Sequence, residues 1–165
     1  MRYFIELAYN GAAYHGWQVQ PKQVSVQETI THALSLILRS PELEIMGCGR
    51  TDTGVHASEY FAHFDFDGEF PKGFLSRLNK FLPKDIAIRR IFPVADDQHA
   101  RFDAHYRAYQ YHLTWQKDPF RQDTIFHLHR AKHCDQALMQ EAAALLLKYD
   151  EFLPFCKTKK RWLFQ

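Results

Sequence analysis

Residues 43–67 read Leu-Glu-Ile-Met-Gly-Cys-Gly-Arg-Thr-Asp-Thr-Gly-Val-His-Ala-Ser-Glu-Tyr-Phe-Ala-His-Phe-Asp-Phe-Asp, which is two strand-like segments around a glycine-rich loop. A short strand is expected over residues 43–48, and a second follows from the alternation of side chains over residues 60–67. Glycine lets a backbone turn tightly and approach a ligand, so the loop predicts that Arg50, Asp52 and His56 are aimed at one place. The alternative is a surface turn in which Asp52 caps its own backbone.

The segments around this pair predict the rest of the fold. Residues 2–9 and 86–92 alternate like strands, and Ser25 with Glu28 forms a capping box at the start of an apolar-striped helix. A second helix is expected to open at Pro71 and to bury a stripe. That stripe contains Phe74, Leu75, Leu78, Phe81 and Leu82. The resulting order, β-α-β-β-α-β, predicts an α+β, ferredoxin-like fold with an antiparallel sheet and both helices on one face.

The second half of the chain predicts an extension of this core. Residues 105–115 are expected to form the longest strand, with Arg107, Tyr109 and Tyr111 on one face; the alternative role for that face is a structural aromatic ladder. A third helix over residues 136–148, capped by Asp135, has enough apolar surface to be well buried. We expect residues 1–150 to form one lobe and residues 151–165 to begin a second lobe or to form a basic tail.

Composition narrows the class of protein. The chain has 165 residues and a formal charge of +2, with apolar and charged fractions typical of a globular domain. Three widely spaced cysteines predict neither a disulfide framework nor a zinc site. The N-terminus alternates like a strand and is not a signal peptide, and no apolar run is long enough for a membrane span. We therefore expect a cytoplasmic protein.

Two further segments have competing interpretations. Residues 12–21 have no clean period but contain Tyr14, Trp17 and Gln18, which suggests a loop with a binding role; the alternative is a hydrophobic plug anchored by Trp17. His127, His129 and His133 have a spacing that a metal site could use, but apart from the isolated Cys134 no nearby carboxylate or thiolate with suitable spacing accompanies them. The expectation is that no metal is bound.

Four stretches resemble the tRNA pseudouridine synthase A family. Residues 49–57 resemble its catalytic Gly-Arg-Thr-Asp-Ala-Gly-Val-His-Ala motif, with Thr53 as the one departure. Residues 9–20 resemble the family's opening motif except at Asn10 and Ala12. Residues 100–102 and 107–111 resemble its Ala-Arg-Phe and Arg-x-Tyr-x-Tyr motifs, and residues 150–157 loosely resemble Asp-Phe-x-x-Phe-x-Lys. The motifs occur in the family's order over nearly the whole chain.

This resemblance implies a function and its residues. Family members are homodimers that need no cofactor and modify uridines 38–40 in the anticodon arm of tRNA. Asp52 would be the catalytic carboxylate, acting either by covalent addition or by removing the 2′ proton to give a glycal. Arg50 would orient it or hold a phosphate. Tyr109 would stack on the extruded uracil, with assistance to proton transfer at C5 as a further role. Weaker expectations are that His56 positions the loop and that Arg107 contacts phosphate. The other residues expected at the substrate-binding site are Tyr111, Tyr14, Trp17 and Gln18.

The family's chains are longer and contain a second lobe. We therefore expect these 165 residues to fold alone but to catalyse poorly. Two rival functions remain: a non-catalytic RNA-binding module of the same fold, and a small-molecule enzyme that uses Asp52 and the histidine-rich segment. The first predicts tRNA binding without chemistry, and the second predicts a ligand or metal requirement without salt-sensitive RNA affinity.

Overall fold

The computed structural model describes residues 1–129 and 134–155. The chain divides into two compact units, Met1–Gln110 and Tyr111–Gln165, and each is described by itself. His133 lies outside the described residues, as does the part of the expected basic tail over residues 156–165. No helix in the described part of the chain is both long and apolar enough to cross a membrane.

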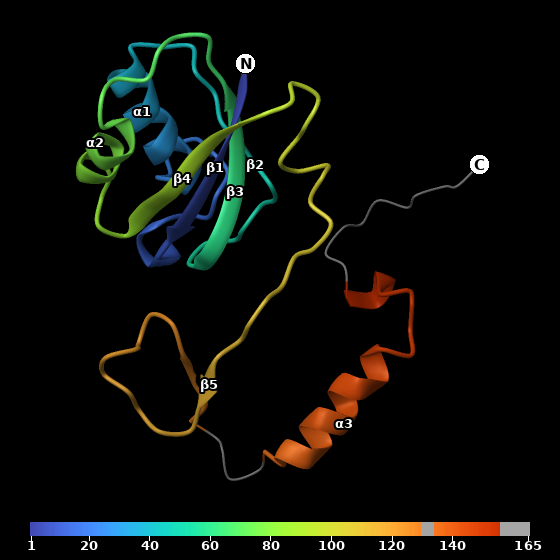
Figure 1. Ribbon diagram of the computed structural model, residues 1–165. Coiled ribbons are helices and arrows are strands. Elements are labelled where there is room, and N and C mark those ends of the chain that lie inside the picture. Colours follow the sequence, from blue (N-terminus) through green and yellow to red (C-terminus); the bar gives the residue numbers. More distant parts are fainter. Residues whose placement is uncertain (130–133, 156–165) are drawn as a thin grey trace. The chain divides into compact units, whose positions relative to one another are not determined.

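The first unit contains a four-stranded antiparallel sheet, as the sequence predicts. Its strands are β1 (Arg2–Tyr9), β2 (Met46–Gly47), β3 (Ala57–Asp65) and β4 (Ile86–Val94), in the order β2-β3-β1-β4. Helices α1 (Val26–Leu38) and α2 (Phe74–Phe81) lie together on one side of this sheet (Figure 1). The chain order β1-α1-β2-β3-α2-β4, with β1 and β3 in the centre, confirms the α+β fold with a ferredoxin-like core.

The core of this unit lies between the sheet and the two helices. Alternation along β1 buries Ile5, Leu7 and Tyr9, and the apolar stripe of α1 buries Ile30 and Leu34 opposite them. The start of α1 is fixed by Ser25, whose Oγ accepts a hydrogen bond from the Glu28 N–H at 3.2 Å. The serine half of the expected capping box is therefore present.

Two element boundaries differ from the prediction. Helix α2 begins at Phe74 rather than Pro71, because Gly73 takes a left-handed conformation, with a φ of +68°, at the position before the helix. Phe74 and Leu78 of its stripe are buried, but Phe81 is 52% exposed. Strand β2 has only two residues, although the Cys48 N–H extends its pairing with β3 by donating to the Phe61 carbonyl at 2.8 Å.

The long strand expected over residues 105–115 is wrong. Only β5 (Leu113–Thr114) is a strand, and it pairs in parallel with β6 (Phe126–His127) in the second unit. Strand formation requires partners for the backbone N–H and C=O groups, and among residues 105–112 only the His112 carbonyl has one in the described part of the chain, accepting from the Phe126 N–H at 2.8 Å. Alternation of side chains is therefore not sufficient to form a strand.

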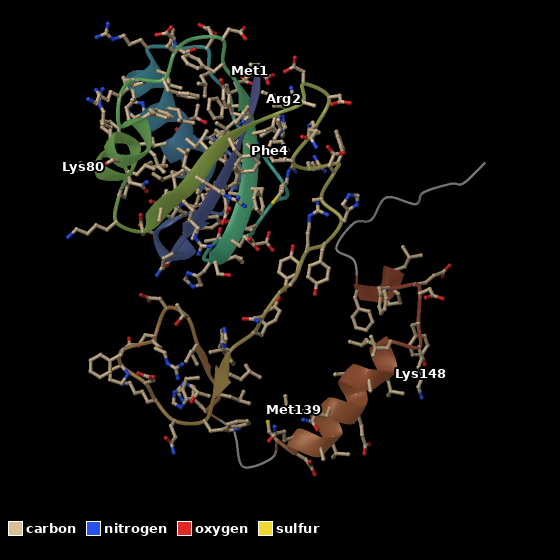
Figure 2. All side chains as sticks on the ribbon, in the orientation of Figure 1. Met1, Arg2, Phe4, Lys80, Met139 and Lys148 are labelled. Atoms are coloured by element: carbon tan, nitrogen blue, oxygen red, sulfur yellow. The ribbon has the colours of Figure 1, made fainter. Side chains whose placement is uncertain are left out.

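The third helix is present but is not buried as expected. Helix α3 (Gln136–Leu146) is capped by Asp135, whose Oδ1 accepts from the Ala137 and Leu138 N–H groups at 2.8 and 3.2 Å. None of its residues is buried: Leu138 is 61% exposed, and Met139, which Figure 2 labels, is 42% exposed. An apolar face shows what a helix can bury, but within the described residues of its own unit, 111–129 and 134–155, no surface buries it. A short 3-10 helix, η3 (Leu153–Phe155), follows.

Candidate active site

The loop that joins β2 to β3 presents Arg50 and Asp52 to solvent. It turns where the Asp52 carbonyl accepts from the Val55 N–H at 3.2 Å. Gly54 allows this turn with a φ of +78° and no atom within 4 Å of the position a Cβ would take. In the described residues no hydrogen bond links the Asp52 side chain to the backbone, so the alternative of a self-capping aspartate does not describe this turn.

A second segment, residues 11–17, supports the loop by direct backbone contact. The Trp17 N–H donates to the Thr51 carbonyl at 3.2 Å, and the Gly11 N–H donates to His56 Nδ1 at 3.1 Å. Gly16 has a φ of +86°, and a Cβ there would lie 2.2 Å from the Thr51 carbonyl oxygen. Only glycine permits both this conformation and this contact. The predicted site residue His56 thus accepts a hydrogen bond that ties the two segments together.

Buried aromatic rings lie beneath the loop. Trp17 is 1% exposed and its ring centroid is 4.2 Å from that of Tyr60. The Tyr60 hydroxyl donates to the Gly49 carbonyl and accepts from the Gly49 N–H at 3.3 Å, and burial raises the pKa of Tyr60 above its usual value. A Cβ on Gly47 would lie only 2.5 Å from the indole ring. The alternative of a hydrophobic plug anchored by Trp17 is confirmed.

Burial also changes the expectation for Tyr14. Its side chain is buried, and its hydroxyl donates to Asp85 Oδ1 at 2.7 Å. Tyr14 and Trp17 therefore support the loop from below and present no surface on which a base can stack. Gln18 is half-buried. Tyr111 is exposed and belongs to the second unit, which is described separately.

Residues 99–109, which we call the strap, follow β4 in the chain. The strap contacts the loop between β2 and β3. The Ala100 N–H donates to Nδ1 of the buried His63 at 3.2 Å, which fixes the start of the strap to β3. Arg107 Nη2 donates to the carbonyls of Cys48 and Arg101, at 2.7 and 2.9 Å. These contacts hold the strap against the first residues of the loop.

A cavity of about 350 Å³ lies between the strap and the loop. This volume is at the lower end of the range of small-ligand sites, roughly 300–1,000 Å³. Its lining residues are Cys48, Gly49, Arg50, Arg101, Phe102, Arg107 and Tyr109. Three guanidinium groups and two aromatic rings suit a ligand that carries both negative charge and a flat ring.

The structure thus brings some of the predicted site residues together and not others. Arg50, Arg107 and Tyr109 line the same cavity, although Arg50 is more than fifty residues before the other two. Asp52 is on the same loop as Arg50, two residues further along. Sequence reasoning did not assign roles to Arg101, Phe102 and His63. The resemblance of residues 100–102 to a family motif was the available signal for the first two; nothing in the sequence marked His63.

His63 has a titration behaviour set by its position. Burial, helped by the nearby charge of Arg2 and by His99, lowers its pKa from 6.5 to about 4. The imidazole is therefore neutral at pH 7. A neutral Nδ1 without a proton is what the hydrogen bond from the Ala100 N–H requires.

We expect this histidine to make the fold sensitive to acid. Between about pH 6.5 and about pH 4 the unfolded chain binds a proton at His63 and the folded chain does not, so lowering the pH favours unfolding. The expected loss of unfolding free energy is on the order of 2 kcal/mol across this window. Urea denaturation at a series of pH values measures it. A His63→Gln variant, which keeps an acceptor but does not titrate, should lose this part of the pH dependence; identical profiles for the two proteins would contradict the assignment.

The histidine-rich segment shows no assembled metal site in its described part. The rings of His127 and His129 are 4.2 Å apart, and His133 lies outside the described residues. No group of three metal-binding side chains is found within residues 1–129 and 134–155.

Comparison with known proteins gives a consistent set of relatives. A protein of Porphyromonas gingivalis named tRNA pseudouridine synthase A is 50% identical over 159 residues, which cover 94% of this chain and 62% of the relative. Proteins of the same name from Azobacteroides pseudotrichonymphae and Pseudoalteromonas translucida are 48% and 43% identical, and cover 94% and 91% of this chain. No family model matches the chain. The chain spans about three fifths of the length of the curated relatives it matches.

Proposed function

This chain is a homologue of the tRNA pseudouridine synthase A family that spans about three fifths of a family member's length, and from this premise we propose that it converts uridine to pseudouridine in tRNA. The observation that carries the proposal is the shared cavity. Arg50 from the loop and Tyr109 from the strap line it together, and Asp52 is exposed on the same loop.

The reaction breaks the N1–C1′ bond of uridine, turns the uracil and forms a C5–C1′ bond. A proton leaves C5 and N1 gains one, so atoms and electrons balance without a redox partner or co-substrate. Positive character develops at the sugar as the glycosidic bond breaks, and a carboxylate stabilises it or adds to it. We assign this role to Asp52, with the covalent and glycal routes both open.

The remaining cavity residues suit the substrate. A uridine must leave the base stack to react, and an aromatic ring that stacks on it offsets part of the cost. Tyr109 is 66% exposed and lines the cavity, so its ring is accessible for this role. Arg50 and Arg101 supply positive charge for the backbone phosphates on either side of the extruded nucleotide.

We further propose uridines 38–40 of the anticodon arm as targets and a homodimer as the active assembly. Support for both is the resemblance of four motifs to the family. The same proposal includes a cytoplasmic location, where a tRNA substrate would be met. Light scattering of the purified protein tests the assembly, and sequencing of pseudouridine positions in treated tRNA tests the target.

The test of the function is release of tritium from tRNA labelled at uridine C5. It should be run on the 165-residue chain and on a completed chain, in which the part of the Porphyromonas gingivalis relative outside the match is supplied. We expect release by the completed chain and little by the 165 residues alone. Salt-sensitive tRNA binding without release would favour the RNA-binding module. Neither binding nor release, with the complete relative active in parallel, would favour the small-molecule enzyme.

Two substitutions of Tyr109 distinguish the contribution of its ring from that of its hydroxyl. Tyr109→Phe should keep tRNA affinity and lose only the rate that depends on the hydroxyl. Tyr109→Leu should lose stacking as well, which is worth about 1–3 kcal/mol per base. Tritium release and filter binding on the completed chain measure the two effects. Equal and mild effects of both variants would support the alternative of a structural aromatic ladder.

A further inference from the structure

Arg107 donates hydrogen bonds to backbone carbonyls of the protein itself. A single nitrogen, Nη2, donates to both the Cys48 and the Arg101 carbonyl, at 2.7 and 2.9 Å. The residue is exposed, and within the described residues no carboxylate forms an ion pair with it. A charged donor makes stronger hydrogen bonds than a neutral one, so the two contacts form a firm link between the segments.

The link joins the loop and the strap, the two segments whose side chains line the cavity. Cys48 is at the start of the loop, two residues before Arg50, and Arg107 is two residues before Tyr109 on the strap. The guanidinium also lies against the loop backbone, since a Cβ on Gly49 would be 3.4 Å from Arg107 Nε. The strap itself is anchored at its other end by the contact between Ala100 and His63.

We propose that Arg107 is a positioning residue that holds Tyr109 in place relative to Arg50 and Asp52, and that it does not act as an RNA phosphate contact. The proposal rests on the proposed function, because the relative positions of these side chains matter only if the reaction takes place among them. The physical argument is that catalytic groups displaced by about 1 Å can lose on the order of 100-fold in rate. An arginine whose Nη2 is occupied by two carbonyls is well suited to prevent such a shift.

The test uses two variants of Arg107 and a matched control. Arg107→Met removes both hydrogen bonds, and Arg107→Lys keeps a cation able to reach one or both carbonyls. Arg101→Met is the control: it also removes a guanidinium from the cavity lining, but leaves in place the Arg101 backbone carbonyl that Arg107 binds. Circular dichroism establishes that each variant is folded.

The first readout is hydrogen–deuterium exchange without RNA. Arg107→Met should speed exchange of the amides at the start of the loop, Cys48 and Gly49, about tenfold or more, because their bonds to Phe61 and Tyr60 open more often. Arg107→Lys should restore part of the protection, and Arg101→Met should leave it unchanged. Unchanged exchange in Arg107→Met would overturn the proposal.

The second readout is kinetics of the completed chain. We expect Arg107→Met to lower kcat about 10- to 100-fold, with tRNA affinity within about twofold and an unchanged salt dependence. A phosphate contact predicts the opposite: weaker binding and a salt slope smaller by about one. That outcome, or a kcat unaffected by faster loop exchange, would overturn the proposal. If the unsubstituted completed chain releases no tritium, the proposed function fails, while exchange still decides whether Arg107 fixes the loop.

Discussion

Replacing Asp52 by asparagine is expected to abolish tritium release by the completed chain, lowering kcat at least about 1,000-fold, while tRNA affinity stays within a few-fold. The amide has the shape of the carboxylate but no negative charge, so it neither stabilises a positive sugar carbon nor adds to it. Asp52 is exposed and no hydrogen bond of its side chain occurs in the described residues, so the substitution should not disturb the loop.

A charge-matched control separates this effect from electrostatics at a distance. Asp97→Asn changes the net charge by the same amount at an exposed position in the turn after β4, before the strap. It should leave kcat within about twofold. Retention of more than a tenth of the activity by Asp52→Asn would remove Asp52 from the catalytic role. Loss of tRNA binding by Asp52→Asn would show that the carboxylate organises the binding surface.

The first unit was predictable because its signals are local and agree with one another. Alternation along residues 2–9, the Ser25 cap and the apolar stripe from Val26 to Leu38 each specify an element, and these elements bury the same core. The β-α-β-β-α-β order then leaves few topologies. The segments after β4 carried equally clear patterns but different outcomes, since among residues 105–112 only the His112 carbonyl bonds to a described strand, and α3 buries none of its residues. Pairing and covering surfaces are properties of other segments, which a local pattern does not contain.

The candidate site divides in the same way. Family motifs identified both Arg50 and Tyr109, which line one cavity, because a motif marks residues whatever their separation along the chain. The contacts of Arg107 with two backbone carbonyls left no trace in the sequence, since every residue has a carbonyl. Residue type was also a poor guide to Tyr14, because a tyrosine suits both a base-stacking surface and a core with one buried acceptor, here Asp85.

Replacing Trp17 by alanine is expected to reduce the free energy of unfolding by about 3–5 kcal/mol, the usual cost of removing a large buried aromatic side chain. The indole is 1% exposed and packs against the rings of Tyr9 and Tyr60. A cavity there also removes support from Gly47, at the point where β2 enters the loop. Urea denaturation followed by circular dichroism measures the loss without relying on tryptophan fluorescence.

Trp115→Ala is the matched control, because this tryptophan is 46% exposed and its removal should cost less than about 1 kcal/mol. Conditions that leave Trp17→Ala folded should still show faster deuterium exchange in the loop, since the ring supports it from below. A loss of less than about 1 kcal/mol for Trp17→Ala, with loop exchange unchanged, would mean that the backbone contacts from Gly11 and Gly16 hold the loop by themselves. In that case the indole would be filling space without supporting the Asp52 loop.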